Sequence, residues 1–227
     1  MPTRACAHAM EDLFSPDDRQ RIADAITEAE AATSAEIVPY VVVQSDVYPA
    51  ARWRGGVLAA LLVGSTAALL RMGIVPGLAP YLTDLYVLAA AFGMGLVGAA
   101  TAASVPPLLR ALTPPDERGR AVYRRAVEVF LDQELFDTRG RTGILLFVSL
   151  NEHRIEVLAD RGIDQQVDET AWSDVTDHIR QGIESDRLTQ GLLNGIERCG
   201  RVLEEHGVEG RPNDEDQLAD RLRHEDE

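Results

Sequence analysis

The sequence predicts an α/β domain into which a transmembrane helical hairpin is inserted. Two observations carry this prediction. The segment from Gly55 to Leu109 is almost wholly apolar, and only Arg71 and Asp84 interrupt it. On both sides of this segment, helical and strand patterns are mixed along the chain, which is typical of a sheet covered by helices. The predicted fold class is therefore a three-layer α/β/α sandwich with an inserted transmembrane hairpin.

The apolar segment is long enough for two membrane spans. A helix needs about 20 apolar residues to cross a bilayer, and Leu85–Leu109 meets that length. Pro106 should end this helix, because proline lacks the N–H donor and clashes in a helix interior. Gly55–Leu70 is shorter, but it reaches full length by continuing through Arg71, whose long side chain can carry its charge to the interface. Trp53 stands where an interfacial aromatic residue is expected.

Small residues recur every four positions in both runs. Such stripes let helix backbones approach closely in lipid, so they predict packing within the hairpin and a possible homo-oligomer. The alternative is that alanine and glycine are simply abundant in this segment. The stripes are Ala60, Gly64 and Ala68 in the first run, and Ala91, Gly95, Ala99 and Ala103 in the second.

Arginines on the flanks of the spans predict the orientation. Cytoplasmic segments next to spans carry an excess of basic residues, so we expect the soluble domain and both termini on the cytoplasmic side of the inner membrane. A two-span hairpin returns the chain to the side it left, and the two soluble pieces can fold together. The flanking arginines are Arg52 and Arg54 before the first span, and Arg110, Arg118, Arg120, Arg124 and Arg125 after the second.

Four segments are expected along the chain. Residues 1–52 and 111–207 form the two parts of the soluble domain, 53–110 form the hairpin, and 208–227 form an acidic disordered tail. Pro39 predicts an edge position or a bulge in the first strand, because proline lacks a ladder donor. The expected helices are Ser15–Thr33, Thr113–Leu135, Glu169–Gln181 and Leu188–His206, and the expected strands are Glu36–Val43, Gly143–Val148 and Arg154–Asp160.

Composition excludes some classes of function. The net charge of −15 argues against general nucleic-acid binding, which needs a basic surface. Cys6 and Cys199 lie far apart and match no metal-binding spacing, so they predict two free thiols in a reducing compartment. The first ten residues contain no apolar stretch of the kind that a signal peptide requires.

An ordered set of motifs resembles the TPM-domain family. Phe136–Leu150 contains a Thr-Gly step into an apolar strand, and Arg154–Ile163 is a second strand that ends in a glycine-containing loop. Thr33–Val38 resembles the first strand of the family, while Ile179–Gly182 and Gly191–Ile196 resemble its ending of two helices. The resemblance covers about Glu11–Glu205, with the hairpin inserted after the first strand.

The resemblance implies a fold and several alternative roles. It implies an α/β/α sandwich, and either maintenance or repair of membrane complexes or auxiliary action on a membrane receptor. Some members resemble acid phosphatases by reported activity, and some bind calcium. Our first hypothesis is a non-catalytic accessory protein that contacts membrane protein complexes. The alternatives are a divalent-metal-dependent phosphatase and a transport unit formed by oligomerised hairpins, which the nearly complete lack of polar residues in the spans disfavours.

The predicted metal site is an acidic cluster after the second strand of the β-hairpin. Loops at strand ends commonly hold ligands in α/β sheets, and converging carboxylates suit Ca²⁺. Metal-binding members of the family carry a Gly-Tyr-Gly-like loop, whereas this chain has Asp160-Arg161-Gly162-Ile163 and lacks the aromatic residue. Solvated carboxylates are the alternative interpretation. The candidate ligands are Asp160, Asp164 and Asp168, with Asp174 as a further candidate.

None of the other candidate residues stands in a sequence context typical of a catalytic site. Arg139 and Arg141 stand beside Asp137 and suggest either a phosphate or lipid-headgroup site or a surface ion pair. Ser149 follows a predicted strand but lacks the Gly-x-Ser-x-Gly context of a nucleophile. His153 has no partner at catalytic spacing, and His178 has none either. The sequence contains no P-loop, dinucleotide-binding or zinc motif, so no catalytic residue is assigned.

Overall fold

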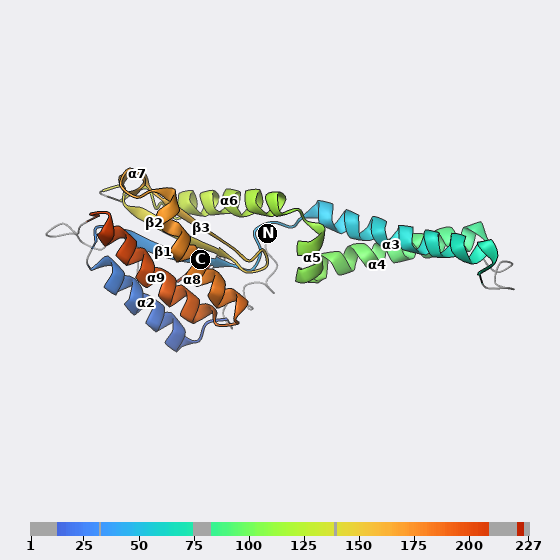
Figure 1. Ribbon diagram of the computed structural model, residues 1–227, viewed down its shortest axis with the longest axis horizontal. Helices are drawn as coiled ribbons and strands as arrows, with labels where there is room; N and C mark the ends of the chain where they lie inside the picture. The colour runs from blue at the N-terminus through green and yellow to red at the C-terminus, as the bar shows by residue number, and fades with distance from the viewer. Residues whose placement is uncertain (1–12, 32, 75–82, 139, 209–221, 225–227) are drawn as a thin grey trace. The chain divides into compact units, whose positions relative to one another are not determined.

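The computed structural model describes residues 13–31, 33–74, 83–138, 140–208 and 222–224. The chain divides into two compact units (Figure 1). Residues 1–45 and 119–227 form the sheet unit, and residues 46–118 form the hairpin unit. Cys6, Arg139 and most of the predicted connecting turn and acidic tail lie outside the described residues.

The sheet unit contains a mixed sheet with the strand order β3-β2-β1-β4. β1 (Glu36–Val42) pairs in parallel with β2 (Gly143–Ser149), and β2 pairs antiparallel with β3 (Arg154–Ala159). β4 (Arg223–His224) adds two residues along β1. Every residue of β1 and β2 is buried, as the continuous apolar pattern of the second strand predicts. The mixed α/β class is confirmed.

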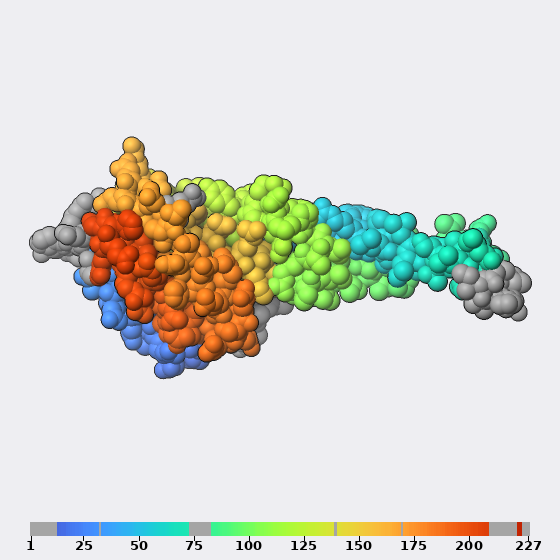
Figure 2. Space-filling model, viewed as in Figure 1, coloured from blue at the N-terminus to red at the C-terminus, as the bar shows by residue number. Residues whose placement is uncertain are grey.

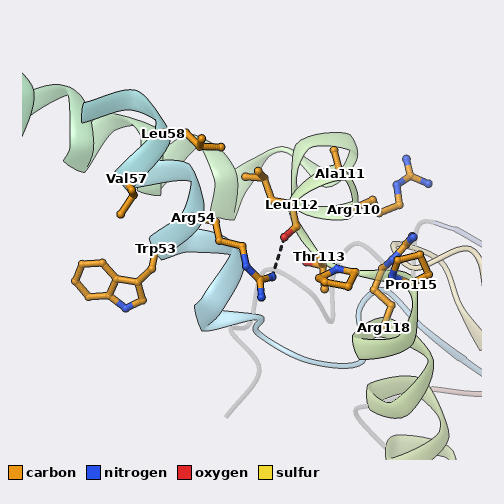
Figure 3. Close-up of a pocket in the computed structure, with 11 residues that line it drawn as sticks. Trp53, Arg54, Val57, Leu58, Arg110, Ala111, Leu112, Thr113, Pro115 and Arg118 are labelled. Atoms are coloured by element: carbon orange, nitrogen blue, oxygen red, sulfur yellow. Dashed lines mark hydrogen bonds between the residues drawn. The ribbon is translucent and has the colours of Figure 1, made fainter. Parts of the chain in front are cut away.

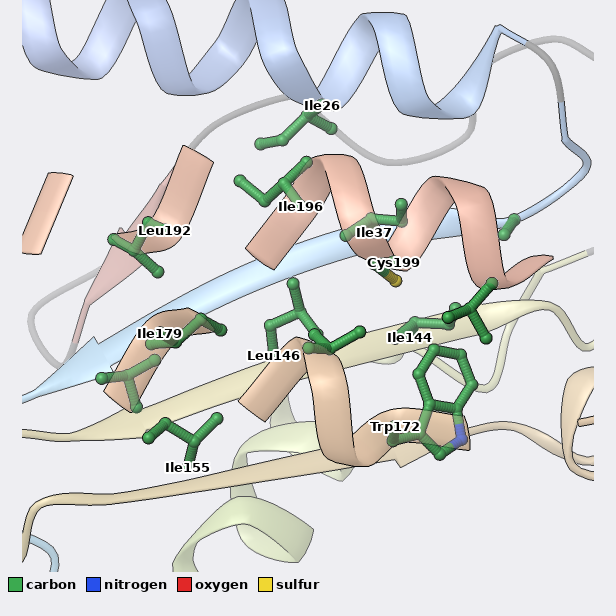
Figure 4. Packing of buried hydrophobic residues seen from close by; sticks show 14 of the residues in the cluster. Ile26, Ile37, Ile144, Leu146, Ile155, Trp172, Ile179, Leu192, Ile196 and Cys199 are labelled. Atoms are coloured by element: carbon green, nitrogen blue, oxygen red, sulfur yellow. The ribbon is translucent and has the colours of Figure 1, made fainter. Parts of the chain in front are cut away.

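Helices cover both faces of this sheet (Figure 1). The larger cluster joins one face to α2 (Pro16–Glu30), α8 (Ser173–Glu184) and α9 (Leu188–Glu205), as Figure 4 shows. The smaller cluster joins the other face to α6 (Pro115–Asp132). Side chains alternate between the two clusters along each strand, as the two-residue period of a strand requires: for example, Ile37 and Ile144 belong to the larger cluster, and Val38 and Leu145 to the smaller.

Helix α2 begins at a capping box that the sequence predicts. The Ser15 hydroxyl oxygen accepts a hydrogen bond from the Asp18 N–H at 3.1 Å, and the Asp18 carboxylate accepts from the Ser15 N–H at 3.1 Å. Pro16 occupies the first helical position, where its missing N–H costs nothing. The hydrogen bond from Ser15 lowers the pKa of the Asp18 carboxyl below its usual value.

Glycines bring α8 and α9 into close contact. A Cβ atom added at Gly182 would lie 2.6 Å from the Gly191 Cα, and one at Gly195 would lie 2.5 Å from the Ile179 side chain. These distances leave no room for a larger residue. The glycines that carry the family resemblance at this end of the domain therefore have a physical reason: they set the distance between two helices.

The hairpin unit consists of two long helices and a short one. α3 (Pro49–Leu69) continues into a π-helical turn at Leu70–Ile74, and it is followed by α4 (Asp84–Ser104) and α5 (Pro106–Leu112). Pro49–Met72 and Asp84–Ser104 are each long and apolar enough to cross a membrane, and only 6% of the most apolar window of each is buried. In the space-filling view of Figure 2, this unit is the elongated part coloured cyan and green.

The packing seam between α3 and α4 differs from the predicted stripes. A Cβ atom at Gly55 would lie 2.6 Å from the Ala102 Cβ, and one at Gly98 would lie 2.5 Å from the Ala59 Cβ. Three residues of the predicted stripes do lie on the seam: a Cβ atom at Gly95 would lie 3.6 Å from the Ala60 Cβ, and one at Gly56 would lie 3.3 Å from the Ala99 Cβ. Gly64, in contrast, has no atom within 4 Å of its added Cβ position. The four-residue count drifts off the contact face, because an α-helix turns once every 3.6 residues.

Three details differ from the sequence-based expectations, and a fourth, the position of Pro39, agrees with the predicted edge position. The proline pair ends one helix and then starts α5, which the sequence did not predict. The helix expected at Glu169–Gln181 is split into a 3₁₀ turn, Glu169–Trp172, and α8. Pro39 lies in β1 just before the two residues that pair with β4, so its position has only β2 as a described neighbour. Within the predicted disordered tail, Arg223–His224 pair with β1 as β4, because the apolar Leu222 is buried in the larger cluster.

Candidate functional site

The acidic loop after β3 is organised around Asp160, the first predicted metal ligand. Its side chain is buried, and it forms an ion pair with Arg141, from Nε to Oδ2, at 2.8 Å. The same carboxylate accepts the Arg141 Nη2–H at 3.1 Å and the Arg161 backbone N–H at 2.7 Å. Asp160 therefore caps the short helix α7 (Arg161–Asp164) and neutralises an arginine. The Oδ2 atom of this buried carboxylate has no hydrogen-bond partner among the described residues, so the contact with the Arg141 Nε is an ion pair without hydrogen-bond geometry.

The other predicted ligands do not join Asp160. Asp164 is exposed in α7, and Asp168 is exposed at the start of the following 3₁₀ turn. Asp174 forms an ion pair with Arg198 on α9 at 3.3 Å. Among the described residues, no group of three or more His, Cys, Asp or Glu side chains is arranged to hold a metal ion. The geometry thus gives the proposed calcium ligands no common centre.

The glycine in this loop serves a close backbone approach. A Cβ atom at Gly162 would lie 2.4 Å from the Gly140 carbonyl oxygen, and the Gly162 N–H donates to the Arg141 carbonyl at 2.8 Å. Arg141 itself adopts a left-handed backbone conformation, with φ of 56°. Glycine is needed here so that the loop before β2 can pack on the loop after β3. The segment Asp160–Ile163, which the sequence suggests as a metal-binding loop, forms a contact between two turns.

A second polar cluster lies where the parallel strands β1 and β2 end. Glu152 is buried, and its carboxylate accepts hydrogen bonds from the Ser149 hydroxyl at 2.5 Å and from the Ser45 N–H at 3.1 Å. The hydroxyls of Ser45 and Ser149 lie 2.7 Å apart. Asn151 donates to the Gln44 side chain at 3.1 Å. These bonds tie the segment after β1 to the turn after β2, and no histidine accompanies Ser149 as a base among the described contacts.

The hairpin unit contains a pocket of about 770 Å³ at the end of α3 opposite the connecting turn (Figure 3). α3 supplies an aromatic residue and apolar side chains on one side, and α5 and the start of α6 supply arginines and prolines on the other. The lining contains no acidic residue, although the chain carries a net charge of −15. The lining residues are Trp53, Arg54, Val57, Leu58, Arg110, Ala111, Leu112, Thr113, Pro114, Pro115 and Arg118.

Arg54 lines this pocket and links α3 to α5 and α6. Its Nη1 donates to the Leu112 carbonyl oxygen at 2.8 Å, as Figure 3 shows, and its guanidinium forms an ion pair with Glu117 at 3.2 Å. The first bond satisfies a carbonyl at the C-terminal end of α5 that has no helical partner. Arg54 thereby fastens α3 to α5, and Glu117 neutralises its charge.

Arg110 and Arg118 differ from Arg54 in having no acidic partner. Within the described part of the chain, neither forms an ion pair or side-chain hydrogen bond. The Nε atom of Arg118 is buried without a hydrogen-bond partner there. A buried N–H donor without an acceptor costs about 1–3 kcal/mol. The pocket therefore holds two uncompensated cations next to an apolar wall formed by Val57 and Leu58.

Comparison with protein families gives a match for the part of the chain that follows the long helices of the hairpin. A family model described as the TPM domain matches residues 108–202. The resemblance to the TPM-domain family is confirmed. The matched range begins in α5 and includes α6, β2, β3, α8 and most of α9. The TPM match thus covers the acidic loop and the turn that contains Glu152.

A solved structure has a similar fold. It is the NMR structure of the BA42 protein from the psychrophilic bacterium Bizionia argentinensis sp. nov., which is 18% identical. The superposition has a TM-score of 0.56 and covers 93% of this chain and 95% of that chain. At this level of identity the likeness concerns the fold alone. A search of curated protein sequences gave no match.

Two features of the candidate sites were missed from the sequence. Glu152 stands between the strands expected at Gly143–Val148 and Arg154–Asp160, where the sequence indicates only a turn, and its burial and hydrogen bonds show that it joins two strand ends. The sequence indicates only an interfacial aromatic residue at Trp53 and an orientation signal in the flanking arginines, whereas Trp53, Arg54, Arg110 and Arg118 line one pocket. The sequence did offer one signal: Arg110 and Arg118 each follow a pair of prolines, and a helix begins within each pair, α5 at Pro106 and α6 at Pro115.

Proposed function

We propose that this chain is a membrane-anchored TPM-like accessory protein of the inner membrane, which acts without catalysis through contacts with membrane protein complexes. The observation that carries the proposal is the exposure of the hairpin's apolar side chains. Phe92 is 72% exposed and Leu62 is 69% exposed, while glycine and alanine occupy the seam between the helices. A helix in the core of a soluble protein buries such side chains, whereas a lipid-facing helix presents them outward.

The position of the hairpin also supports this proposal. It enters after β1 and returns before α6, so both flanks must lie on one membrane side. Arg52 lies in the first turn of α3, where the hairpin begins, and Arg120 lies in α6 after the hairpin unit; both are exposed. By the positive-inside rule, we propose that the sheet unit and both termini are cytoplasmic. We further propose that the sheet unit is a three-layer sandwich in which α6 alone forms the thin layer.

A capture experiment tests the accessory role. The full chain is tagged, lightly cross-linked in native membranes, extracted and purified. The proposal predicts the same membrane protein partners in repeated preparations, and their loss when the hairpin is replaced by an unrelated two-span hairpin. Recovery of the chain alone, after cross-linking that captures known complexes in the same membranes, would contradict it.

A labelling experiment tests the orientation. Thr83, at the start of α4, is replaced by cysteine in a Cys6→Ser background, and intact cells are treated with a thiol reagent that cannot cross the membrane. The proposed orientation predicts labelling at position 83 in intact cells. A cysteine at the exposed Arg120 is the matched control, and it should react only after permeabilisation. The opposite pattern would reverse the orientation.

A further inference from the structure

The pocket of the hairpin unit combines features that together suit one class of ligand. It has two arginines without acidic partners, an exposed indole and an aliphatic wall, and it lies at one end of the two apolar helices. We infer that this pocket binds the headgroup and upper acyl chain of an anionic phospholipid. This inference rests on the proposed membrane insertion of α3 and α4, and it adds a specific lipid site to that anchor.

Charge is the first argument for a phospholipid. A guanidinium binds phosphate oxygens through paired N–H donors. Arg110 and Arg118 offer such donors in a pocket without any carboxylate, and the Arg118 Nε–H is buried without an acceptor. Because the chain as a whole is strongly acidic, a pocket in which two of three arginines have no acidic partner among the described residues indicates an anionic ligand. Arg54 takes no part in this binding, since Glu117 and the Leu112 carbonyl already occupy it.

The apolar wall is the second argument, because it distinguishes a lipid from a free phosphate. Val57 is 53% exposed and Leu58 is 56% exposed on the α3 side of the pocket. Inorganic phosphate gains nothing from these side chains, whereas an acyl chain covers them. Trp53, which is 75% exposed, also lines the pocket, and indole rings favour the boundary between headgroups and acyl chains. The pocket therefore offers one kind of side chain for each part of a phospholipid: cationic for the headgroup, indole for the boundary and aliphatic for the acyl chain.

Fluorescence quenching tests the inference on the full chain in lipid nanodiscs. The probe is a phosphatidylglycerol with bromine on its acyl chains, compared with an equally brominated phosphatidylcholine. Bromine quenches an indole on contact, so Trp53 reports the local lipid; Trp172 is buried in the sheet unit and supplies a constant background. We expect stronger quenching by the anionic lipid at equal mole fraction, and its loss in Trp53→Phe.

Matched charge variants separate a site from general attraction. Near an anionic surface each arginine contributes about fivefold to binding, so any two lost arginines weaken diffuse attraction equally. Arg110→Gln with Arg118→Gln removes the pocket cations, and Arg52→Gln with Arg120→Gln removes two exposed arginines outside the pocket. We expect the pocket pair to lower the preference for the anionic lipid by at least fivefold more than the control pair. Equal losses in the two pairs would overturn the inference.

The remaining outcomes are also decisive. Equal quenching by both brominated lipids would refute the lipid site while leaving the membrane anchor intact. No quenching by either lipid would refute both the anchor and the site. Excess inorganic phosphate should not change the preference, because the acyl wall contributes to binding; if phosphate removes the preference, the pocket is a phosphate site and the lipid inference is wrong.

Discussion

The two units of this chain place large and small side chains in opposite positions. In the sheet unit, the fully buried residues are large and apolar, such as Phe147, Leu146 and Ile196. In the hairpin unit, the buried residues of the long helices are alanines and glycines, including Gly55 and Ala102, and the large apolar residues point outward. This difference is what the proposed membrane insertion of the hairpin predicts: water expels large apolar groups, whereas lipid does not, so helices in lipid associate through close backbone contact.

The largest expected effect contrasts one substitution in the two units. Leu146→Ala should destabilise the sheet unit by about 2–5 kcal/mol, because it leaves a cavity at a fully buried position. Leu62→Ala removes the same atoms from a side chain that is exposed on α3, and it should change stability by about 0.5 kcal/mol or less. Hydrogen exchange of peptides from β2 and α3, in nanodiscs, measures both. Similar losses at the two positions would break the comparison.

The second effect concerns the seam of the hairpin. Gly98→Leu should separate α3 from α4, because even a Cβ atom at Gly98 would overlap Ala59, and such overpacking costs about 1–3 kcal/mol. Gly64→Leu is the control, since no atom lies near its added Cβ position. The readout is disulfide formation between Ala60→Cys and Gly95→Cys, whose Cβ atoms would be 3.6 Å apart, within the range of a disulfide.

We expect rapid cross-linking in the parent protein and with Gly64→Leu, and several-fold slower cross-linking with Gly98→Leu. All variants carry Cys6→Ser, and Cys199 remains because it is buried. Burial also raises the pKa of the Cys199 thiol, which keeps it protonated and unreactive. Equal cross-linking rates in the two leucine variants would show that small residues do not set the helix contact.

A smaller effect is expected at the polar cluster after β1 and β2. Ser149→Ala removes the hydroxyl that donates to the buried Glu152 carboxylate, and it should cost about 1–3 kcal/mol because an acceptor loses its partner without access to water. Ser185→Ala, an exposed hydroxyl at the end of α8, is the control and should be nearly neutral. Hydrogen exchange at β1 and β2 measures the loss. Unchanged exchange in Ser149→Ala would show that the cluster is not structural.

The smallest effect concerns the start of α2. Ser15→Ala should cost about 1 kcal/mol, the typical value for a lost N-cap. Because Ser15 lowers the pKa of Asp18, this contribution is present above the unfolded pKa of about 3.9 and is lost as the pH falls through the folded pKa. The difference between parent and variant should therefore shrink below about pH 4. Asp17→Asn, on the same turn, is the control, and its stability should depend on pH as that of the parent does. If the stability difference between the parent and Ser15→Ala did not change with pH, the capping box would be contradicted.

The sequence predicts the elements well where a repeating pattern exists. Ile155, Val157 and Ala159 alternate with other residues and predict a strand, and Ser15 before Pro16 and two acids predicts a helix start. Both patterns are local, and the structure has β3 and the capping box of α2 at these places. For the contact between α3 and α4, the sequence predicts that small residues form it but not all of the residues involved. A repeat of four residues does not follow one face of a helix with 3.6 residues per turn. The pocket depends on a hydrogen bond between Arg54 and Leu112, which are 58 residues apart in the sequence. The Glu152 cluster depends on a hydrogen bond between Ser45 and Glu152, which are 107 residues apart. No local pattern reports such contacts.

Insertion of the hairpin between two paired strands has a consequence for biosynthesis. Glu36 of β1 pairs with Gly143 of β2, so β1 waits for 107 further residues (143 − 36) before its partner leaves the ribosome. At about 5–20 residues per second this takes roughly 5–20 s, during which the hairpin is made. The bond from Arg54 to the Leu112 carbonyl spans 58 of these residues and leaves an effective loop of 49 (107 − 58). Closing this shorter loop costs about 0.7 kcal/mol less. A hairpin that packs first therefore lowers the entropy cost of pairing β1 with β2.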